Sequence, residues 1–139
     1  MKFLFKMFMV LHVGLYRLTG GKFGGNIQGF KVLILTTTGR KSGKVRTVPL
    51  GFFEQPQGYV IVASNNGLPT HPAWYQNLKA NPRVTIQVFD KVMFVTAEVL
   101  DSESRARAWQ QVISAAPSYA AYEKKKGRQI PLVLLHPDK

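Results

Sequence analysis

Residues 32–46 read Val-Leu-Ile-Leu-Thr-Thr-Thr-Gly-Arg-Lys-Ser-Gly-Lys-Val-Arg. The apolar, β-branched run at 32–38 predicts a strand that is buried on both faces. Residues 45–53 alternate well enough to be its hairpin partner, with Pro49 and Gly51 marking an edge or a bulge. The glycine-bracketed turn region carries four cations and no acid: Arg40, Lys41, Lys44 and Arg46. Such a turn offers backbone N–H groups and fixed positive charge to one small anion.

The rest of the chain contains further strand patterns of similar length. They cover residues 59–63, 84–89, 92–99 and 130–135, with tight turns at 55–58 and 90–91. Together with the first hairpin they make six short strands, most of them joined by hairpins. Six strands exceed what one flat sheet in a chain of this size could cover. We therefore predict a mainly β (α+β) domain built as a small antiparallel barrel.

Three internal segments predict helices across the openings of this barrel. The first begins at Pro72 and ends before Asn81-Pro82. The second has Asp101 as its N-cap, and a third follows at 117–126. Helical spacing predicts that the second helix packs through Ala106, Trp109, Val112, Ile113 and Ala116.

The N-terminal residues 2–19 predict an amphipathic helix. They are too few, and too often interrupted by charge, for a membrane-spanning segment. A glycine-rich linker at 20–25 follows, so the expected units are 1–25 and 26–139.

Two interpretations of this helix stay open. It either covers one end of the fold or an oligomer interface, or it lies on a membrane surface. On a membrane, its phenylalanines would reach the acyl boundary, and these cations would lie at head-group level: Lys2, Lys6, Arg17 and Lys22.

Charge is unevenly distributed along the 139 residues, whose formal net charge is +12. Residues 1–53 hold nine Lys and Arg and no acid, whereas residues 54–139 hold ten basic and seven acidic residues. Partners of matching sign are phosphates, polycarboxylates, anionic lipid heads or nucleic acid. The chain has no cysteine, which favours the cytoplasm as its location.

The residue inventory argues against metal and hydrolytic sites. The three histidines, His12, His71 and His136, match no metal-ligand spacing. Ser64 and His71 could meet, but the seven acids are scattered over apparent surface positions, which disfavours a carboxylate that orients the imidazole. The dinucleotide fingerprint and the Walker-type loop are absent.

Two aromatic pairs and the basic turn each allow a plain and a functional interpretation. Trp74 and Tyr75 open a helix, and Tyr119 and Tyr122 share a helical face, so each pair either packs in the core or lines a pocket. The basic turn is either a solvated loop or an anion site.

Several motifs in sequence order resemble the deazaflavin-dependent nitroreductase family, within the flavin/deazaflavin oxidoreductase superfamily. The resemblance spans about residues 27–137. It is carried by residues 35–43, Arg46, Pro49-Leu50, 62–64, 72–78, Asn81-Pro82, 117–122 and 128–131.

The resemblance implies a six-stranded split β-barrel of the FMN-binding type that binds coenzyme F-420, an 8-hydroxy-5-deazaflavin. A hydride would pass from the reduced coenzyme to a quinone, an enone or a nitroaromatic acceptor. The catalytic residues implied at the reacting side are Ser64, Tyr119 and Tyr122.

The resemblance also implies which residues hold the coenzyme. The basic turn would bind its phosphate and oligoglutamate tail, and residues 63–67 would lie along the ring. The implied coenzyme-binding residues are Thr38, Arg40, Lys41, Ser42, Gly43, Arg46, Pro49, Ala63, Ser64, Asn65, Asn66, Gly67, Trp74 and Tyr75. Asn65-Asn66 departs from the smaller or glycine-rich pair that is common in the family.

Two other functions compete with this one. An FMN-dependent reductase would use the same barrel, and a non-catalytic binder of anionic lipid or nucleic acid would use the basic turn alone. No aromatic residue interleaves with the cations of residues 39–46, so no nucleic-acid partner is expected. The expected location is the cytoplasm, and under the membrane interpretation of residues 2–19 the protein would attach peripherally to the inner face of the plasma membrane.

Overall fold

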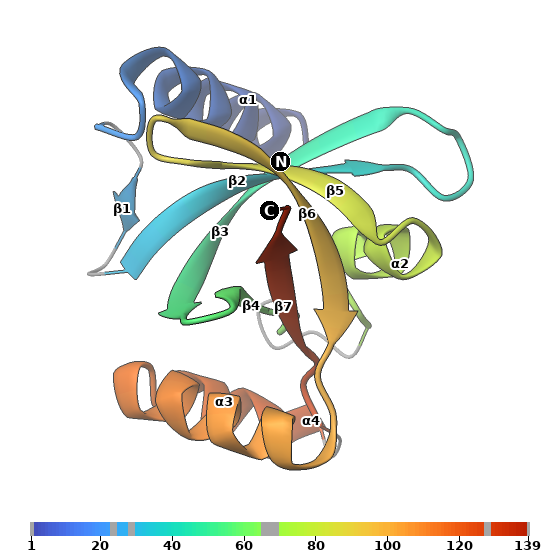
Figure 1. Cartoon of the computed structure of the whole chain (residues 1–139). Helices are drawn as coiled ribbons and strands as arrows, with labels where there is room; N and C mark the ends of the chain where they lie inside the picture. The colour runs from blue at the N-terminus through green and yellow to red at the C-terminus, as the bar shows by residue number, and fades with distance from the viewer. Residues whose placement is uncertain (1, 23–24, 28–29, 65–69, 127–128, 139) are drawn as a thin grey trace.

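The computed structural model describes residues 2–22, 25–27, 30–64, 70–126 and 129–138 (Figure 1). The strands are β1 (Asn26–Ile27), β2 (Phe30–Thr38), β3 (Val45–Gln55), β4 (Gly58–Val62), β5 (Arg83–Val88), β6 (Lys91–Val99) and β7 (Leu132–Pro137). The helices are α1 (Lys2–Thr19), α2 (Ala73–Ala80), α3 (Ser102–Ala115) and α4 (Ser118–Lys126).

Six strands close into an antiparallel barrel, which confirms the predicted fold class. The order is β2-β3-β4-β7-β6-β5, and β5 pairs back onto β2. The two-residue β1 was not predicted and pairs with the start of β2. Strand β7 begins at Leu132, two residues later than predicted.

Strand β2 is paired along both edges in its middle. Ile34, Leu35 and Thr36 face β3 on one side and β5 on the other. The β5 pairing ends at Thr36, while the β3 pairing continues to Thr38 opposite Val45. The tip of the β2–β3 hairpin therefore projects from the barrel (Figure 1).

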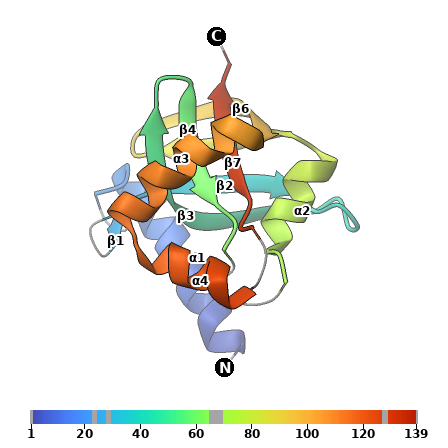
Figure 2. The ribbon, with the colours of Figure 1, turned by 90° about the horizontal axis from the view of Figure 1, so that it is seen from below.

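The helices cover different parts of the barrel, and α2 is the one whose described side chains pack into its interior. Trp74, Tyr75 and Leu78 of α2 join the interior cluster around Leu33 and Ile61. Helix α3 lies on the outer face of β4 and β7, and α1 lies at the opposite side of the barrel (Figures 1 and 2). We predicted that the helices lie across the openings of the barrel, and of these α2 packs into the interior. The other helices lie on outer faces of the strands, because apolar side chains that point outward from the barrel must also be shielded from water.

The packing face of α3 differs from the prediction. Its buried residues are Arg105, Ala108 and Val112, whereas Ala106 is exposed and Trp109 is half-buried. The face is rotated because a buried arginine takes part in it, and apolar periodicity does not detect a buried charge. Asp101 stands at the N-cap as predicted, but its side chain makes no capping hydrogen bond.

Helix α1 is tied to the barrel by Tyr16, which is fully buried. The Tyr16 hydroxyl accepts a hydrogen bond from the Phe89 N–H at 2.5 Å and donates one to the Gln87 carbonyl at 3.2 Å. Phe89 has a positive φ of 54°, which a phenylalanine rarely adopts. A Cβ on Gly21, whose φ is 85°, would lie 2.8 Å from the Phe89 Cα, so only glycine fits there. The α1 end and the β5–β6 turn therefore form one packed unit.

We expect Tyr16→Phe to lower the free energy of unfolding by about 1–3 kcal/mol, because the partly buried Phe89 N–H loses its acceptor. Urea denaturation of the two proteins at pH 7 measures this difference. Tyr59→Phe is the matched control, since the Tyr59 hydroxyl makes no hydrogen bond within the described part of the chain. Equal losses in both variants would contradict the role given to the Tyr16 hydroxyl.

Candidate functional site

The turn between β2 and β3 has a defined conformation. The Gly39 N–H donates to the Lys44 carbonyl at 2.8 Å, and the Gly43 N–H donates to the Gly39 carbonyl at 2.9 Å. Gly43 has a φ of 71°, in the left-handed region that favours glycine. The Ser42 hydroxyl accepts a hydrogen bond from the Lys44 N–H at 3.2 Å. These bonds hold a compact turn that presents its long basic side chains outward.

Asn77 of α2 anchors this turn and was not predicted from the sequence. Its Oδ1 accepts hydrogen bonds from the Arg40 N–H at 3.1 Å and from Arg40 Nη1 at 3.4 Å. Its Nδ2 donates to the Thr37 hydroxyl at 3.2 Å. Asn77 is only 5% exposed, so these bonds satisfy a buried amide. The available sequence signal was a polar residue three positions after Trp74, on the helix face that packs inward.

A cavity of about 480 Å³ lies between the hairpin and α2. It is lined by Thr37, Gly39, Arg40, Lys41, Ser42, Arg46, Thr47, Val48, Ala73, Trp74 and Asn77. Five of the residues predicted to bind a coenzyme therefore share one cavity: Arg40, Lys41, Ser42, Arg46 and Trp74.

The cations of the hairpin turn are not neutralised by ion pairs within the described part of the chain. Among the described residues, no carboxylate forms an ion pair with Arg40, Lys41, Lys44 or Arg46. The N–H groups of Lys41 and Ser42 donate no hydrogen bond to any described residue. Unpaired cations beside unused N–H groups are suited to an anion with several oxygen atoms.

Other predicted residues lie outside the lining of this cavity. Thr38, Gly43 and Pro49 are parts of the same hairpin. Tyr75 is buried below Trp74, with ring centroids 6.4 Å apart. Asn65, Asn66 and Gly67 fall outside the described residues.

Ala63 and Ser64 lie where β4 ends. The Ala63 N–H donates to the Pro131 carbonyl at 3.0 Å, which fixes this segment beside the approach to β7. Ser64 is only 8% exposed, and its hydroxyl makes no hydrogen bond with any described residue. A buried hydroxyl that has no partner among the described residues is suited to a ligand that supplies one.

Tyr119 and Tyr122 lie on α4, with ring centroids 6.1 Å apart. They pack against the cluster between α3 and the outer face of β4 and β7, and they do not line the cavity at the hairpin. Neither hydroxyl makes a hydrogen bond within the described part of the chain. Burial, and to a lesser extent the neighbouring Tyr122, raises the pKa of Tyr119 above its usual value of 10.0. Its hydroxyl therefore stays protonated at neutral pH and can donate a hydrogen bond.

The described residues contain no group of His, Asp and Glu side chains that could hold a metal ion. None of the helices, as far as the structure describes them, has the length and apolar character needed to cross a membrane.

Comparison with known proteins identifies relatives for nearly the whole chain. The family model of the F420H2-dependent quinone reductases matches residues 8–137. The chain is 42% identical over 129 residues to an F420H2-dependent quinone reductase of Mycobacterium tuberculosis, covering 90% of this chain and 87% of that protein. A putative F420H2-dependent quinone reductase of the same species is 34% identical over 105 residues, covering 76% of this chain and 88% of the relative.

Two solved structures are similar to this chain over most of its length. A chain described as an F420-H2 dependent reductase (FDR-A) is 45% identical with a TM-score of 0.70, covering 76% of this chain and 93% of that one. The heme storage protein HutZ of Vibrio cholerae, at 21% identity and a TM-score of 0.60, shares the fold over 81% of this chain and 84% of that one.

The raised pKa of Tyr119 predicts a pH effect on stability. The folded chain holds the Tyr119 proton more tightly than the unfolded chain does. The resulting contribution to the free energy of unfolding is complete below the unfolded pKa of 10.0. This contribution is lost as the pH rises through the higher pKa of Tyr119 in the folded chain. Unfolding free energies from urea titrations should therefore fall less steeply between about pH 9 and pH 11 in Tyr119→Phe than in the wild type. Parallel curves for the two proteins would show that Tyr119 titrates with its ordinary pKa.

Proposed function

This chain belongs to the F420H2-dependent quinone reductase family, and we propose on that premise that it passes a hydride from reduced coenzyme F-420 to a quinone. When bound, the reduced coenzyme supplies the hydride from the C5 carbon of its deazaflavin ring. The chain's own tasks are to bind that coenzyme, to orient it and to exclude water from the reacting atoms.

The basic hairpin is the observation that carries this proposal. The coenzyme has a phosphate and an oligoglutamate tail, so it needs a site with several cations and no competing acid. Arg40, Lys41 and Arg46 line the cavity with Ser42, and no described carboxylate is paired with them. Because Asn77 holds the turn from below, the site is preorganised and less ordering free energy is lost on binding.

The acceptor side of the proposal rests on α4 and the end of β4. Trp74 borders the cavity, and the Ser64 hydroxyl is buried with no protein partner among the described residues, which supports a contact with the ring. Tyr119 carries a protonated hydroxyl that can donate to the oxygen of a quinone as charge develops on it. A strong general base is not required for hydride transfer, which agrees with the few acids and histidines of the chain.

An FMN-dependent reductase is the competing function on the same fold. FMN carries a single phosphate, and it would leave part of the cation set at the hairpin without a partner. The number of cations at the cavity therefore favours the coenzyme with the longer anionic tail.

The double variant Arg40→Ala/Lys41→Ala tests the coenzyme site. We expect each lost charge-assisted contact to weaken coenzyme F-420 binding by about 1.5–3 kcal/mol, measured by fluorescence titration. The wild type should also oxidise the reduced coenzyme in the presence of a soluble quinone.

The matched control is Lys91→Ala/Lys124→Ala, which removes the same charge from exposed positions away from the hairpin. Its affinity for the coenzyme should equal that of the wild type. Tight binding of FMN together with no binding of coenzyme F-420 would overturn the proposed function.

Peripheral attachment to an anionic membrane is the second part of the proposal. Helix α1 turns Val13 and Tyr16 toward the barrel. Its other side exposes four apolar residues, with exposed fractions of 64% for Val10, 59% for Leu11, 48% for Leu15 and 86% for Leu18. Exposed Arg17 and Lys22 lie close to this apolar face in sequence and suit anionic head groups. This arrangement would bring the protein to a lipid-soluble acceptor.

The variant Leu11→Ser/Leu15→Ser/Leu18→Ser should lose most sedimentation with liposomes of phosphatidylserine and phosphatidylcholine, because the apolar area that enters the bilayer is removed. Val45→Ser/Val92→Ser is the control, since these strand residues are equally exposed, at 69% and 68%. Unchanged pelleting of the helix variant would refute membrane attachment through α1.

A further inference from the structure

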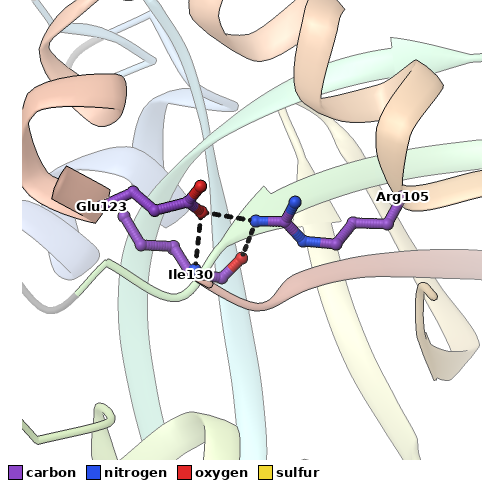
Figure 3. A network of polar contacts seen from close by, with 3 residues as sticks. All are labelled: Arg105, Glu123 and Ile130. Atoms are coloured by element: carbon purple, nitrogen blue, oxygen red, sulfur yellow. Dashed lines mark hydrogen bonds and ion pairs between the residues drawn. The ribbon is translucent and has the colours of Figure 1, made fainter. Parts of the chain in front are cut away.

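A buried arginine on α3 joins three parts of the chain (Figure 3). Arg105 Nη2 donates to Glu123 Oε2 of α4 at 2.6 Å and to the Ile130 carbonyl at 2.8 Å. The same Glu123 oxygen accepts the Ile130 N–H at 2.9 Å. We call these three residues the Arg105 network.

The Arg105 network is well enclosed for a charged group. The side chains of Arg105 and Glu123 are 10% and 26% exposed, whereas those of the Arg107–Glu103 pair on the same helix are 74% and 92% exposed. The Arg105 guanidinium also lies 4.9 Å from the centre of the Trp109 ring. A buried pair contributes little net stability but fixes geometry closely, because either charge left alone inside would be costly.

The network fixes the part of α4 that carries the two tyrosines. Helix α4 starts directly after α3, where the Tyr119 N–H donates to the Ala116 carbonyl at 3.1 Å. Its other anchor is Glu123, the residue that follows Tyr122. Tyr119 and Tyr122 therefore lie between two attachment points, and the second depends on Arg105.

The network also reaches the end of β4. Ile130 precedes Pro131, whose carbonyl accepts the Ala63 N–H at 3.0 Å. A continuous set of bonds thus runs from Glu123 through Ile130 and Pro131 to Ala63, the neighbour of Ser64.

We propose that Arg105 is a positioning residue that sets the distance between the α4 tyrosines and the Ala63–Ser64 segment, and thereby the placement of the acceptor against the coenzyme ring. This inference rests on the proposed function, in which those two segments border the reacting atoms. Hydride transfer needs donor and acceptor atoms in near contact, so a small displacement of either wall lowers the rate strongly.

A double-mutant cycle between Arg105→Met and Tyr119→Phe tests this role in the full chain. With reduced coenzyme F-420 and menadione, Arg105→Met should lower kcat/KM roughly 10- to 100-fold when Tyr119 is present. It should lower kcat/KM by a clearly smaller factor when Tyr119 is already phenylalanine, because one of the groups that Arg105 positions, the Tyr119 hydroxyl, is gone. The hairpin holds most of the coenzyme. The dissociation constant of the coenzyme should therefore stay within about twofold of the wild-type value when Arg105→Met is introduced, with or without Tyr119.

The matched control is Arg107→Met, which removes an exposed arginine from the same helix and should leave all these values unchanged. Amide hydrogen exchange without coenzyme gives a second readout. Exchange of the Ala63 amide and of the α4 amides should be faster in Arg105→Met and unchanged in Arg107→Met. If Arg105→Met does not fold, Glu123→Gln, which keeps the shape and one acceptor oxygen, replaces it in the cycle with a smaller fall of about threefold or more.

Equal losses with and without Tyr119, or no loss in either background, would overturn the positioning role. So would a Tyr119→Phe variant with wild-type kcat/KM. Unchanged Ala63 exchange would overturn it as well, even if the wild type fails to use the coenzyme. Such a failure of the wild type would by itself contradict only the proposed function.

Discussion

The double pairing of β2 is the constraint on which the rest of the structure depends. Where β2 bonds to both β3 and β5, the barrel closes and β2 itself is paired along both of its edges. Past Thr36 the β5 pairing stops, and β2 and β3 continue alone into the turn. The apolar first half of β2 therefore completes the core, while its threonine-rich second half extends a charged loop into solvent without disturbing that core.

Charge in this protein is separated by location. The described acids that form ion pairs do so on the barrel and the C-terminal helices, for example Glu54 with Lys31 and Glu123 with Arg105. The hairpin tip has no such partner among the described residues. Pairing internal to the protein would cancel the local field, so its absence at the tip leaves a positive potential directed at the cavity. Arg105 shows the opposite case, because its ion pair with Glu123 neutralises its charge in the protein interior and gives it a structural role.

Local patterns were enough to predict the six barrel strands, the four helices and the cations of the hairpin, because periodicity, turn residues and charge runs are visible over a few positions. Asn77 and Arg105 were missed because their roles depend on partners 37 and 18 residues away, namely Arg40 and Glu123. A polar residue inside a helical pattern looks the same whether it faces water or a buried acceptor. For the same reason the packing face of α3 was misplaced by a fraction of a turn.

The attachment of α1 through Tyr16 has a geometric consequence. Because the Tyr16 hydroxyl bonds to backbone groups at the β5–β6 turn, the C-terminal half of the helix is fixed to the barrel at this point. Any flat surface that binds the outward-facing residues of α1 must therefore bind the whole molecule in one orientation. The mouth of the cavity would then stand at a set height and tilt above that surface, so that lateral diffusion in two dimensions would replace a random three-dimensional search for the opening.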